Sequence, residues 1–185
     1  KTVVLKKLAP KLVAIIDDLP HKAGVFYVHN FKREILYIGK AKNIKKNVNQ
    51  LFLRTSKKAK IIQNNVVSVT YEETGNELIS QLKYIEELKM NKPRFNTSIK
   101  NNVAAIQFCN ENMLVIDKGR HVGEKSVILI EDNQFKGFCF TDLSYQITNI
   151  EVLKNLISPM ENSPQNRTVV KKYLQKNNVE KIIRF

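Results

Sequence analysis

The feature that most constrains the fold is the stretch LYIGKAKNIKKNV, residues 36 to 48. It begins as an apolar, β-favouring run, passes Gly39, and continues at once into an amphipathic segment rich in lysine. Aromatic and β-branched residues favour strands, and Asn43 can cap the helix that follows. The stretch therefore predicts a strand, a turn and a helix that together gather several cations, an arrangement suited to phosphate.

Two further segments predict that this strand belongs to a small sheet. Residues 24–29 (GVFYVH) and 34–39 (EILYIG) are short β-rich runs separated by a polar turn, which indicates an antiparallel hairpin. Residues 66–72 (VVSVTYE) have the same character and predict a third strand.

Two helices are expected around these strands. The helix capped by Asn43 has an apolar stripe made of Ile44, Val48, Leu51 and Phe52. A second helix is expected to begin with a capping box formed by Thr74 and Glu77, and to end before Pro93. The resulting order, ββαβα, predicts a compact α/β (α+β) unit with a three-stranded antiparallel sheet.

The chain divides into three predicted parts: a leading helix in residues 1–19, the α/β unit in residues 20–99, and a second small antiparallel β plus α unit in residues 100–185. Pro10 suits the first position of the leading helix and Pro20 its end. In the last part we expect strands at 103–109, 113–119, 126–131 and 135–140, helices at 149–158 and 164–177, and a final strand at 179–185.

Positive charge is concentrated in one part of the chain. The 185 residues carry a formal net charge of +14, and residues 32–60 alone hold ten Lys and Arg against one acid. Residues 101–185 hold eleven cations and nine acids, so they are nearly balanced. A charge run can be a solvated helix face, but an excess of this size beside a strand, glycine and helix indicates a polyanionic partner, with nucleic acid the first choice.

The remaining composition indicates a cytoplasmic protein. Cys109 and Cys139 each lie in an apolar run, so we expect two buried free thiols, which suits a reducing compartment. No stretch approaches the length of a membrane span, and residues 1–30 lack a signal-peptide pattern. Because the first residue is Lys1 rather than Met, we expect that an N-terminal portion has been removed or omitted.

Taken together, GVFY, LYIGKAKNIKKNV, the capped helix and KPRFN (residues 92–96) resemble the GIY-YIG nuclease domain, in the version found at the start of the excision-repair nuclease UvrC. An even closer likeness is to the GIY-YIG segment of bacterial proteins that fuse it to an exonuclease domain of the polymerase III epsilon type. The resemblance covers residues 19–99, and its spacing is continuous from Gly24 to Asn96. It implies the fold of that family.

The resemblance also implies a catalytic site. In the family, one tyrosine helps to deprotonate the attacking water, a second tyrosine and an arginine orient and neutralise the phosphate, and a glutamate on the long helix holds a divalent metal. The second tyrosine and the glycine of YIG are kept as Tyr37 and Gly39. The positions of the first tyrosine, the arginine, a later tyrosine or histidine, and the glutamate fall on Phe26, Asn47, Leu51 and Tyr84.

These four replacements cannot supply the family's chemistry. Phe26 has no phenol, and the adjacent Tyr27 points to the other face of the strand. Asn47 has no charged, bidentate fork for a phosphate, and the neutral phenol of Tyr84 is a poor ligand for Mg²⁺. The sequence therefore predicts a nuclease fold with a degenerate site, without a metal ion or another cofactor.

We predict from the sequence a catalytically inactive protein that grips nucleic-acid backbone. The resemblance favours DNA, although structured RNA fits the same lysines. The expected binding residues are Lys40, Lys42, Asn43, Lys45, Lys46, Arg54, Lys57, Lys58 and Lys60. Two alternatives are an active endonuclease with a relocated site, which uses Tyr37, Lys40 and Glu87 with Mg²⁺ or Mn²⁺, and a protein-protein module that docks an acidic partner, with residues 100–185 supplying the interface.

Overall fold

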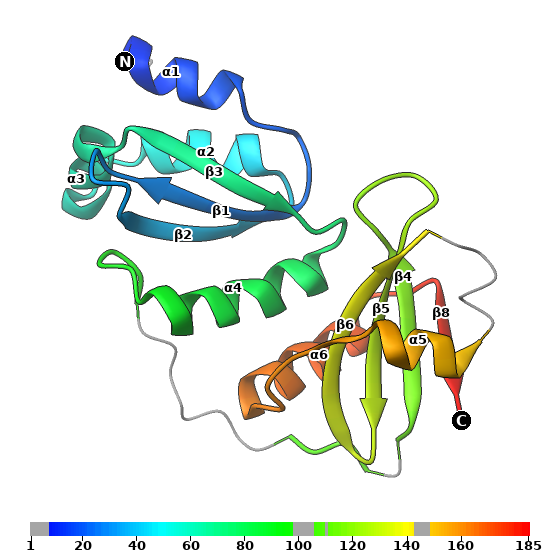
Figure 1. The fold of residues 1–185 in the computed structure, drawn as a ribbon. Helices are drawn as coiled ribbons and strands as arrows, with labels where there is room; N and C mark the ends of the chain where they lie inside the picture. The colour runs from blue at the N-terminus through cyan, green and yellow to red at the C-terminus, as the bar shows by residue number, and fades with distance from the viewer. Residues whose placement is uncertain (1–7, 98–105, 110, 143–148) are drawn as a thin grey trace.

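The computed structural model describes residues 8–97, 106–109, 111–142 and 149–185. It contains two antiparallel sheets, and helix α4 (Glu77–Asn91) lies between the first sheet and the C-terminal unit (Figure 1). None of the helices in the described ranges has both the length and the apolar character that a bilayer crossing requires.

The N-terminal sheet has three antiparallel strands in the order β2-β1-β3, as the sequence predicted. Their bounds are β1 (Gly24–His29), β2 (Ile35–Ala41) and β3 (Ser68–Glu73). Because β1 is central and fully paired on both sides, β2 is an edge strand that carries the YIG residues along the border of the sheet.

Helices α2 (Ile44–Leu53) and α3 (Lys57–Asn65) cover one face of this sheet, together with α1 (Pro10–Asp17). The Asn43 side chain accepts a hydrogen bond from the Lys46 amide and caps α2, as expected. Leu12 and Ile16 of α1 belong to the same buried cluster as Phe52 of α2. The leading helix is therefore part of the core of the α/β unit.

The sequence prediction missed α3. Ser56 caps this helix by accepting a hydrogen bond from the Ala59 amide, and Ala59 and Ile62 are its buried residues. Apart from the partly buried Ile61, its other positions are polar or basic, so the apolar period is too weak to indicate a helix. The order of the unit after α1 is therefore ββααβα and not ββαβα.

The predicted capping box at the start of α4 is wrong. The helix cap is Asn76, whose Oδ1 accepts a hydrogen bond from the Ile79 amide. Thr74 instead donates to the Asn76 carbonyl and shares a hydrogen bond with Ser80. Gly75, with φ of 72°, turns the chain between the two candidates, and the Asn76 amide also reaches the second sheet by donating to the Lys118 carbonyl. Asparagine satisfies both partners, which threonine could not do from position 74.

The C-terminal unit is a five-stranded antiparallel sheet in the order β7-β6-β5-β4-β8. Its elements are β4 (Met113–Lys118), β5 (Lys125–Glu131), β6 (Gln134–Thr141), α5 (Ile150–Leu156), β7 (Ser158–Pro159), α6 (Pro164–Lys176) and β8 (Lys181–Arg184). Helix α6 packs on one face and α5 on the other, so the strands are buried on both sides. This confirms a second antiparallel β plus α unit.

Three details of this unit differ from the prediction. Of the expected strand at 103–109, residues 103–105 lie outside the described ranges and residues 106–109 are not a strand. The expected helix at 149–158 ends at Leu156, and Ser158 belongs to β7. Cys109 is an exposed free thiol, whereas Cys139 is buried as expected, and burial raises its pKa to about 11.

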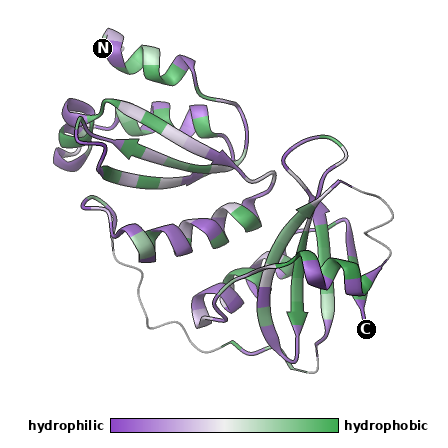
Figure 2. Cartoon of the chain, viewed as in Figure 1, coloured by the Kyte–Doolittle hydropathy of each residue, from purple (hydrophilic) through white to green (hydrophobic). Residues whose placement is uncertain are grey.

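Helix α4 joins the two units because both of its faces are apolar. Tyr84 and Leu88 pack under β1 and β2. On the other face, Leu78, Ile79, Leu82 and Ile85 share a buried cluster with Val115, Ile128 and Val170 of the C-terminal unit. Figure 2 shows the resulting hydrophobic and hydrophilic bands along α4. The C-terminal unit is thus docked on this helix through a continuous core.

Candidate nucleic-acid interface

Phe26, where the family resemblance places the first tyrosine, is a core residue. Its side chain is only 3% exposed and lies in the cluster under α2. Phe26 pairs with Gly39 across β1 and β2, and a Cβ on Gly39 would overlap the Phe26 ring. The glycine of YIG is therefore needed to accommodate an aromatic ring that carries no hydroxyl.

Tyr37 lies on the same face of the sheet, with its ring centroid 6.2 Å from that of Phe26. Burial raises the pKa of Tyr37, the nearby Tyr84 raises it further, and Arg54 opposes the shift. The Nζ of Lys58 lies 5.4 Å from the Tyr37 ring centroid. Two of the expected binding residues, Arg54 and Lys58, thus come together at a neutral phenol on the edge strand.

Asn47 and Leu51 both lie on α2 but differ in burial. Leu51 is 4% exposed and packs with Phe52 and Ile62, so it belongs to the core. Asn47 is partly buried, and its side-chain amide donates to the Lys40 carbonyl at 3.3 Å, which ties the helix to the end of β2. Neither side chain carries the positive charge of an arginine.

Tyr84 contacts Asn96, a residue that the sequence did not identify as part of the candidate site. Asn96 donates to the Tyr84 hydroxyl at 3.4 Å and also pairs with the β2 backbone, by donating to the Ile38 carbonyl and accepting from the Ile38 amide. The Phe95 amide donates to the Leu36 carbonyl in the same manner. The segment after α4 therefore covers the open edge of β2, and the sequence signal for this pairing is only the presence of an asparagine after Pro93.

The donors around Tyr84 do not fit the divalent metal that the family resemblance implies. A phenol and a carboxamide replace the carboxylate oxygens that Mg²⁺ prefers. Glu87 is the carboxylate of the relocated-site alternative. It accepts a hydrogen bond from Asn91, and its charge raises the pKa of Tyr27. Within the described ranges, no three His, Cys, Asp or Glu side chains gather as a metal site. We therefore derive no catalytic step through a metal ion.

Tyr27 confirms that the two faces of β1 are not interchangeable. It packs with Val25 and Ile38 toward α4, and its hydroxyl donates to Glu72. Burial is the main cause that raises the pKa of Tyr27, and the carboxylates of Glu72 and Glu87 raise it further. Tyr27 cannot replace the missing phenol at Phe26, because it lies on the opposite side of the sheet.

The basic residues after Gly39 form an open hollow. This lysine-turn pocket has a volume of about 500 Å³ and is lined by Lys40, Ala41, Lys42, Asn43, Lys46, Asn47, Gln50, Glu77 and Ser80. Lys42, with a side chain 78% exposed, pairs with Glu77 at 2.8 Å. Lys40 and Lys46 make no ion pair with the carboxylates of the described residues. The pocket therefore offers two uncompensated cations and a third that can exchange its partner.

The other expected cations lie outside this pocket. Lys45 turns toward α1, where it donates to the Asp17 carbonyl at 3.1 Å. Arg54 follows α2, and Lys57 and Lys60 are exposed on α3. The structure thus brings Lys40, Lys42 and Lys46 together, and places the remaining cations along the adjoining helices.

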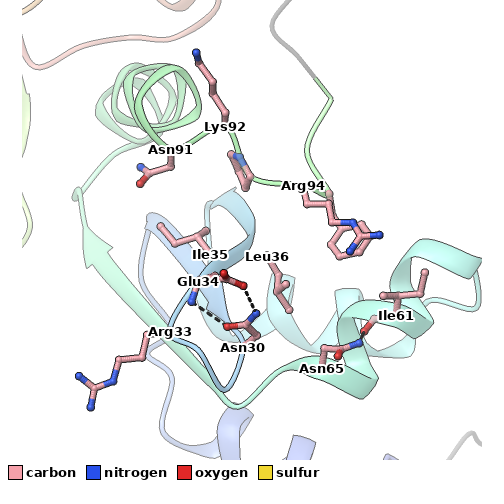
Figure 3. Close-up of a pocket in the computed structure, with 12 residues that line it drawn as sticks. Asn30, Arg33, Glu34, Ile35, Leu36, Ile61, Asn65, Asn91, Lys92 and Arg94 are labelled. Carbon is pink, nitrogen blue, oxygen red and sulfur yellow. Dashed lines mark hydrogen bonds between the residues drawn. The ribbon is translucent and has the colours of Figure 1, made fainter.

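A separate pocket of about 550 Å³ lies at the opposite end of β2 (Figure 3). The turn between β1 and β2, α3 and the end of α4 build it, and Asn30 orders the turn through hydrogen bonds with Glu34. Its cations are Arg33, Lys92 and Arg94, and Arg94 covers the Phe95 ring. This pocket contains none of the positions that the family uses for catalysis.

Comparison with known proteins agrees with this geometry. Residues 22–97 match the UvrC-like GIY-YIG domain family. UvrABC system protein C of Borrelia duttonii (strain Ly) is 33% identical over 99 residues, which cover 53% of this chain and 16% of that protein. The corresponding protein of Mycoplasmoides gallisepticum is 39% identical over 92 residues, covering 47% and 15%.

Among solved structures, the magnesium-bound GIY-YIG N-terminal endonuclease domain of UvrC from Thermotoga maritima is similar at 22% identity and a TM-score of 0.45. The match covers 49% of this chain and all of that chain. Residues 22–97 are a GIY-YIG domain of the UvrC-like family. The chain matches only about 16% of the length of these curated relatives.

Proposed function

We propose that this protein binds nucleic acid through its GIY-YIG domain without cutting it. One contrast carries the proposal: Phe26 on β1 and Leu51 on α2 are buried in the core, whereas Lys40, Lys42 and Lys46 line an open pocket where β2 ends and α2 begins. The side chains that would cut are engaged in packing, and the side chains that would hold phosphate remain accessible.

The ligand we propose is DNA, held by its backbone. Residues 22–97 match the UvrC-like GIY-YIG domain family, and the similar curated proteins are UvrABC system proteins C. Lysine contacts to phosphate fix position without reading bases, so sequence preference should be small. Both cysteines are free thiols, which fits the reducing cytoplasm in which we place this function.

Binding is tested by fluorescence anisotropy with linear duplex DNA, branched DNA and a structured RNA at several salt concentrations. Affinity for DNA should fall steeply with salt, because bound phosphates release counterions. The variant Lys40→Ala/Lys42→Ala/Lys46→Ala should bind more weakly, and its salt slope should be shallower by up to about 2.7. A matched control removes three lysines from other surfaces: Lys11→Ala/Lys136→Ala/Lys181→Ala.

The outcomes separate the alternatives. Tighter binding of the structured RNA than of either DNA would identify RNA, and not DNA, as the ligand. An affinity that does not depend on salt concentration would overturn the nucleic-acid proposal. Catalytic inactivity is tested by incubating the parent with linear and branched DNA and Mg²⁺ or Mn²⁺. Both substrates should stay intact. Metal-dependent cleavage that is lost in Tyr37→Phe would show an active endonuclease with a relocated site.

A further inference from the structure

A second hollow adjoins the lysine-turn pocket where α4 begins and α6 passes it. It has a volume of about 420 Å³ and is lined by Lys42, Glu77, Gln81, Thr168, Val169, Lys172, Tyr173, Lys176 and Asn177. Lys42 and Glu77 line both hollows. The two hollows therefore meet at the Lys42–Glu77 ion pair and form one groove that crosses from the GIY-YIG domain to the C-terminal unit.

The two sides of this groove are held in fixed register. Helix α6 packs on α4, and Val170 lies in the same buried cluster as Leu78 and Ile79. The Asn76 amide donates to the Lys118 carbonyl and to Ser126, both in the C-terminal unit. A Cβ on Gly75 would overlap the backbone of Gly119, which shows how closely the two loops approach.

The groove is strongly cationic. Five lysines line its two hollows, namely Lys40, Lys42, Lys46, Lys172 and Lys176, and Glu77 is the one acid among the lining residues of these two hollows. Lys172 and Lys176 are exposed and lie one turn apart on α6, separated by about 6 Å along the helix axis. Like charges at this spacing repel each other and weaken a helix. A polyanion in the groove would remove that repulsion.

The lining favours a polymer backbone over a small phosphorylated molecule. Both hollows are open and are lined mainly by charged and polar residues, whereas small-molecule sites are concave and lined mainly by apolar ones. Tyr173, the aromatic residue of the groove, donates its hydroxyl to Asp117 and packs in the C-terminal core. It is therefore held by the protein and not presented as a stacking surface for a base.

We infer that the nucleic-acid interface is composite, and that Lys172 and Lys176 of α6 bind the phosphodiester backbone beside the lysine turn. This inference rests on the proposed function, since it concerns the same ligand. It assigns a binding role to the C-terminal unit. Glu77 lowers the affinity of the groove for nucleic acid, because its carboxylate pairs with Lys42 and repels phosphate.

The first experiment measures duplex DNA binding by Lys172→Ala/Lys176→Ala over a range of salt concentrations. Affinity should fall on the order of tenfold, and the salt slope should become shallower by up to about 1.8. The control Lys136→Ala/Lys181→Ala removes the same charge from β6 and β8 and should bind like the parent. Thermal unfolding of both variants checks that the C-terminal unit remains folded.

The result discriminates between the two proposals. If the lysine-turn variant loses affinity while Lys172→Ala/Lys176→Ala binds like the parent, the interface ends at Lys42 and the composite groove is wrong. If the parent itself does not bind nucleic acid, the proposed function fails before this question arises.

A second variant tests the groove by a gain of affinity. Glu77→Gln removes the carboxylate and frees Lys42, so it should bind duplex DNA more tightly than the parent and with a steeper salt dependence. Glu161→Gln is the matched control, because it releases the partnered Lys89 at a site outside both hollows. Unchanged or weaker binding by Glu77→Gln would contradict the restraining role of Glu77.

Discussion

Two regions of the hairpin β1–β2 and helix α2 have opposite character. Around Tyr37, two side chains that the family resemblance places in the catalytic site point inward: Phe26 lies against Gly39, and Leu51 is packed with Phe52. A short distance along the chain, Lys40 and Lys46 point outward into an open pocket. One backbone thus holds an apolar interior and a basic surface side by side.

This contrast predicts that substitutions in the two regions affect different properties of the protein. Core side chains contribute several kcal/mol each to stability, whereas surface side chains usually contribute within about 0.5 kcal/mol. Phe26 and Leu51 are core side chains, whereas Lys40 and Lys46 line the open pocket. The variants below are chosen to test whether the two regions are this independent.

The largest effect is expected at Phe26. Phe26→Ala removes a buried ring and should lower the free energy of unfolding by about 3–5 kcal/mol. Lys46→Ala, from the basic region, should change it by no more than about 0.5 kcal/mol. Urea unfolding followed by circular dichroism measures both. A loss below about 1 kcal/mol for Phe26→Ala would mean that the ring is not part of the core.

A smaller effect is expected at Leu51. Leu51→Tyr places a larger ring in a filled core and should cost about 1–3 kcal/mol of unfolding free energy. Leu53→Tyr is the matched control, because Leu53 lies on the same helix with a side chain 40% exposed. Equal stability of the two variants would show that position 51 has room for the side chain that the family carries.

The sequence was sufficient for those elements whose patterns are local. The strands β1, β2 and β3 follow from short β-rich runs, and Asn43 marks the start of α2. Helix α3 escaped prediction because its buried face consists of Ala59 and Ile62 among lysines and amides. The cap of α4 was misplaced because the choice of Asn76 depends on Lys118, a partner distant in the sequence.

The candidate site was predictable only in part, because some of its contacts join residues that are distant in the sequence. Positions such as Phe26 and Tyr84 follow from spacing within the family resemblance. The pairing of Asn96 with the edge of β2 and the approach of Lys172 to Lys42 depend on how α4 packs between two sheets. Such contacts join residues far apart in the chain, so no local pattern indicates them.

Restoring the family's residues is expected to have a modest effect on stability. The variant Phe26→Tyr/Asn47→Arg/Tyr84→Glu leaves Leu51 in the core and returns a phenol, a guanidinium and a carboxylate to the positions where the family resemblance places them. Mg²⁺ at ten times its dissociation constant should then stabilise the protein by about 1.4 kcal/mol, measured by thermal unfolding. Weak nicking of plasmid DNA should accompany the shift.

The control for restoration is Phe26→Tyr/Asn47→Arg, which lacks the carboxylate and should not respond to Mg²⁺. A folded triple variant without a Mg²⁺ response would contradict the assignment of these positions. It would show that the backbone around Tyr37 has diverged along with its side chains.

The smallest effect is expected from pH. Burial raises the pKa of Tyr37 above its ordinary value near 10, so the folded protein binds the phenolic proton more tightly than the unfolded chain. Its stabilising contribution is complete below pH 10 and is lost as the pH rises through the folded pKa. Unfolding experiments at pH 9 and pH 11 should therefore show a loss of stability that is reduced in Tyr37→Phe.

An exposed ring provides the comparison for this titration. Tyr71 lies on β3 with a side chain 41% exposed, and Tyr71→Phe should retain the alkaline loss of the parent. Tyr27 is buried on the other face of the sheet, and its raised pKa adds to the same loss, so Tyr27→Phe/Tyr37→Phe should reduce the loss more than either change alone. Equal alkaline losses in the parent and Tyr37→Phe would mean that Tyr37 is solvated and accessible. The inward-facing character of the region would then be wrong at Tyr37, the tyrosine that the family resemblance identifies as retained.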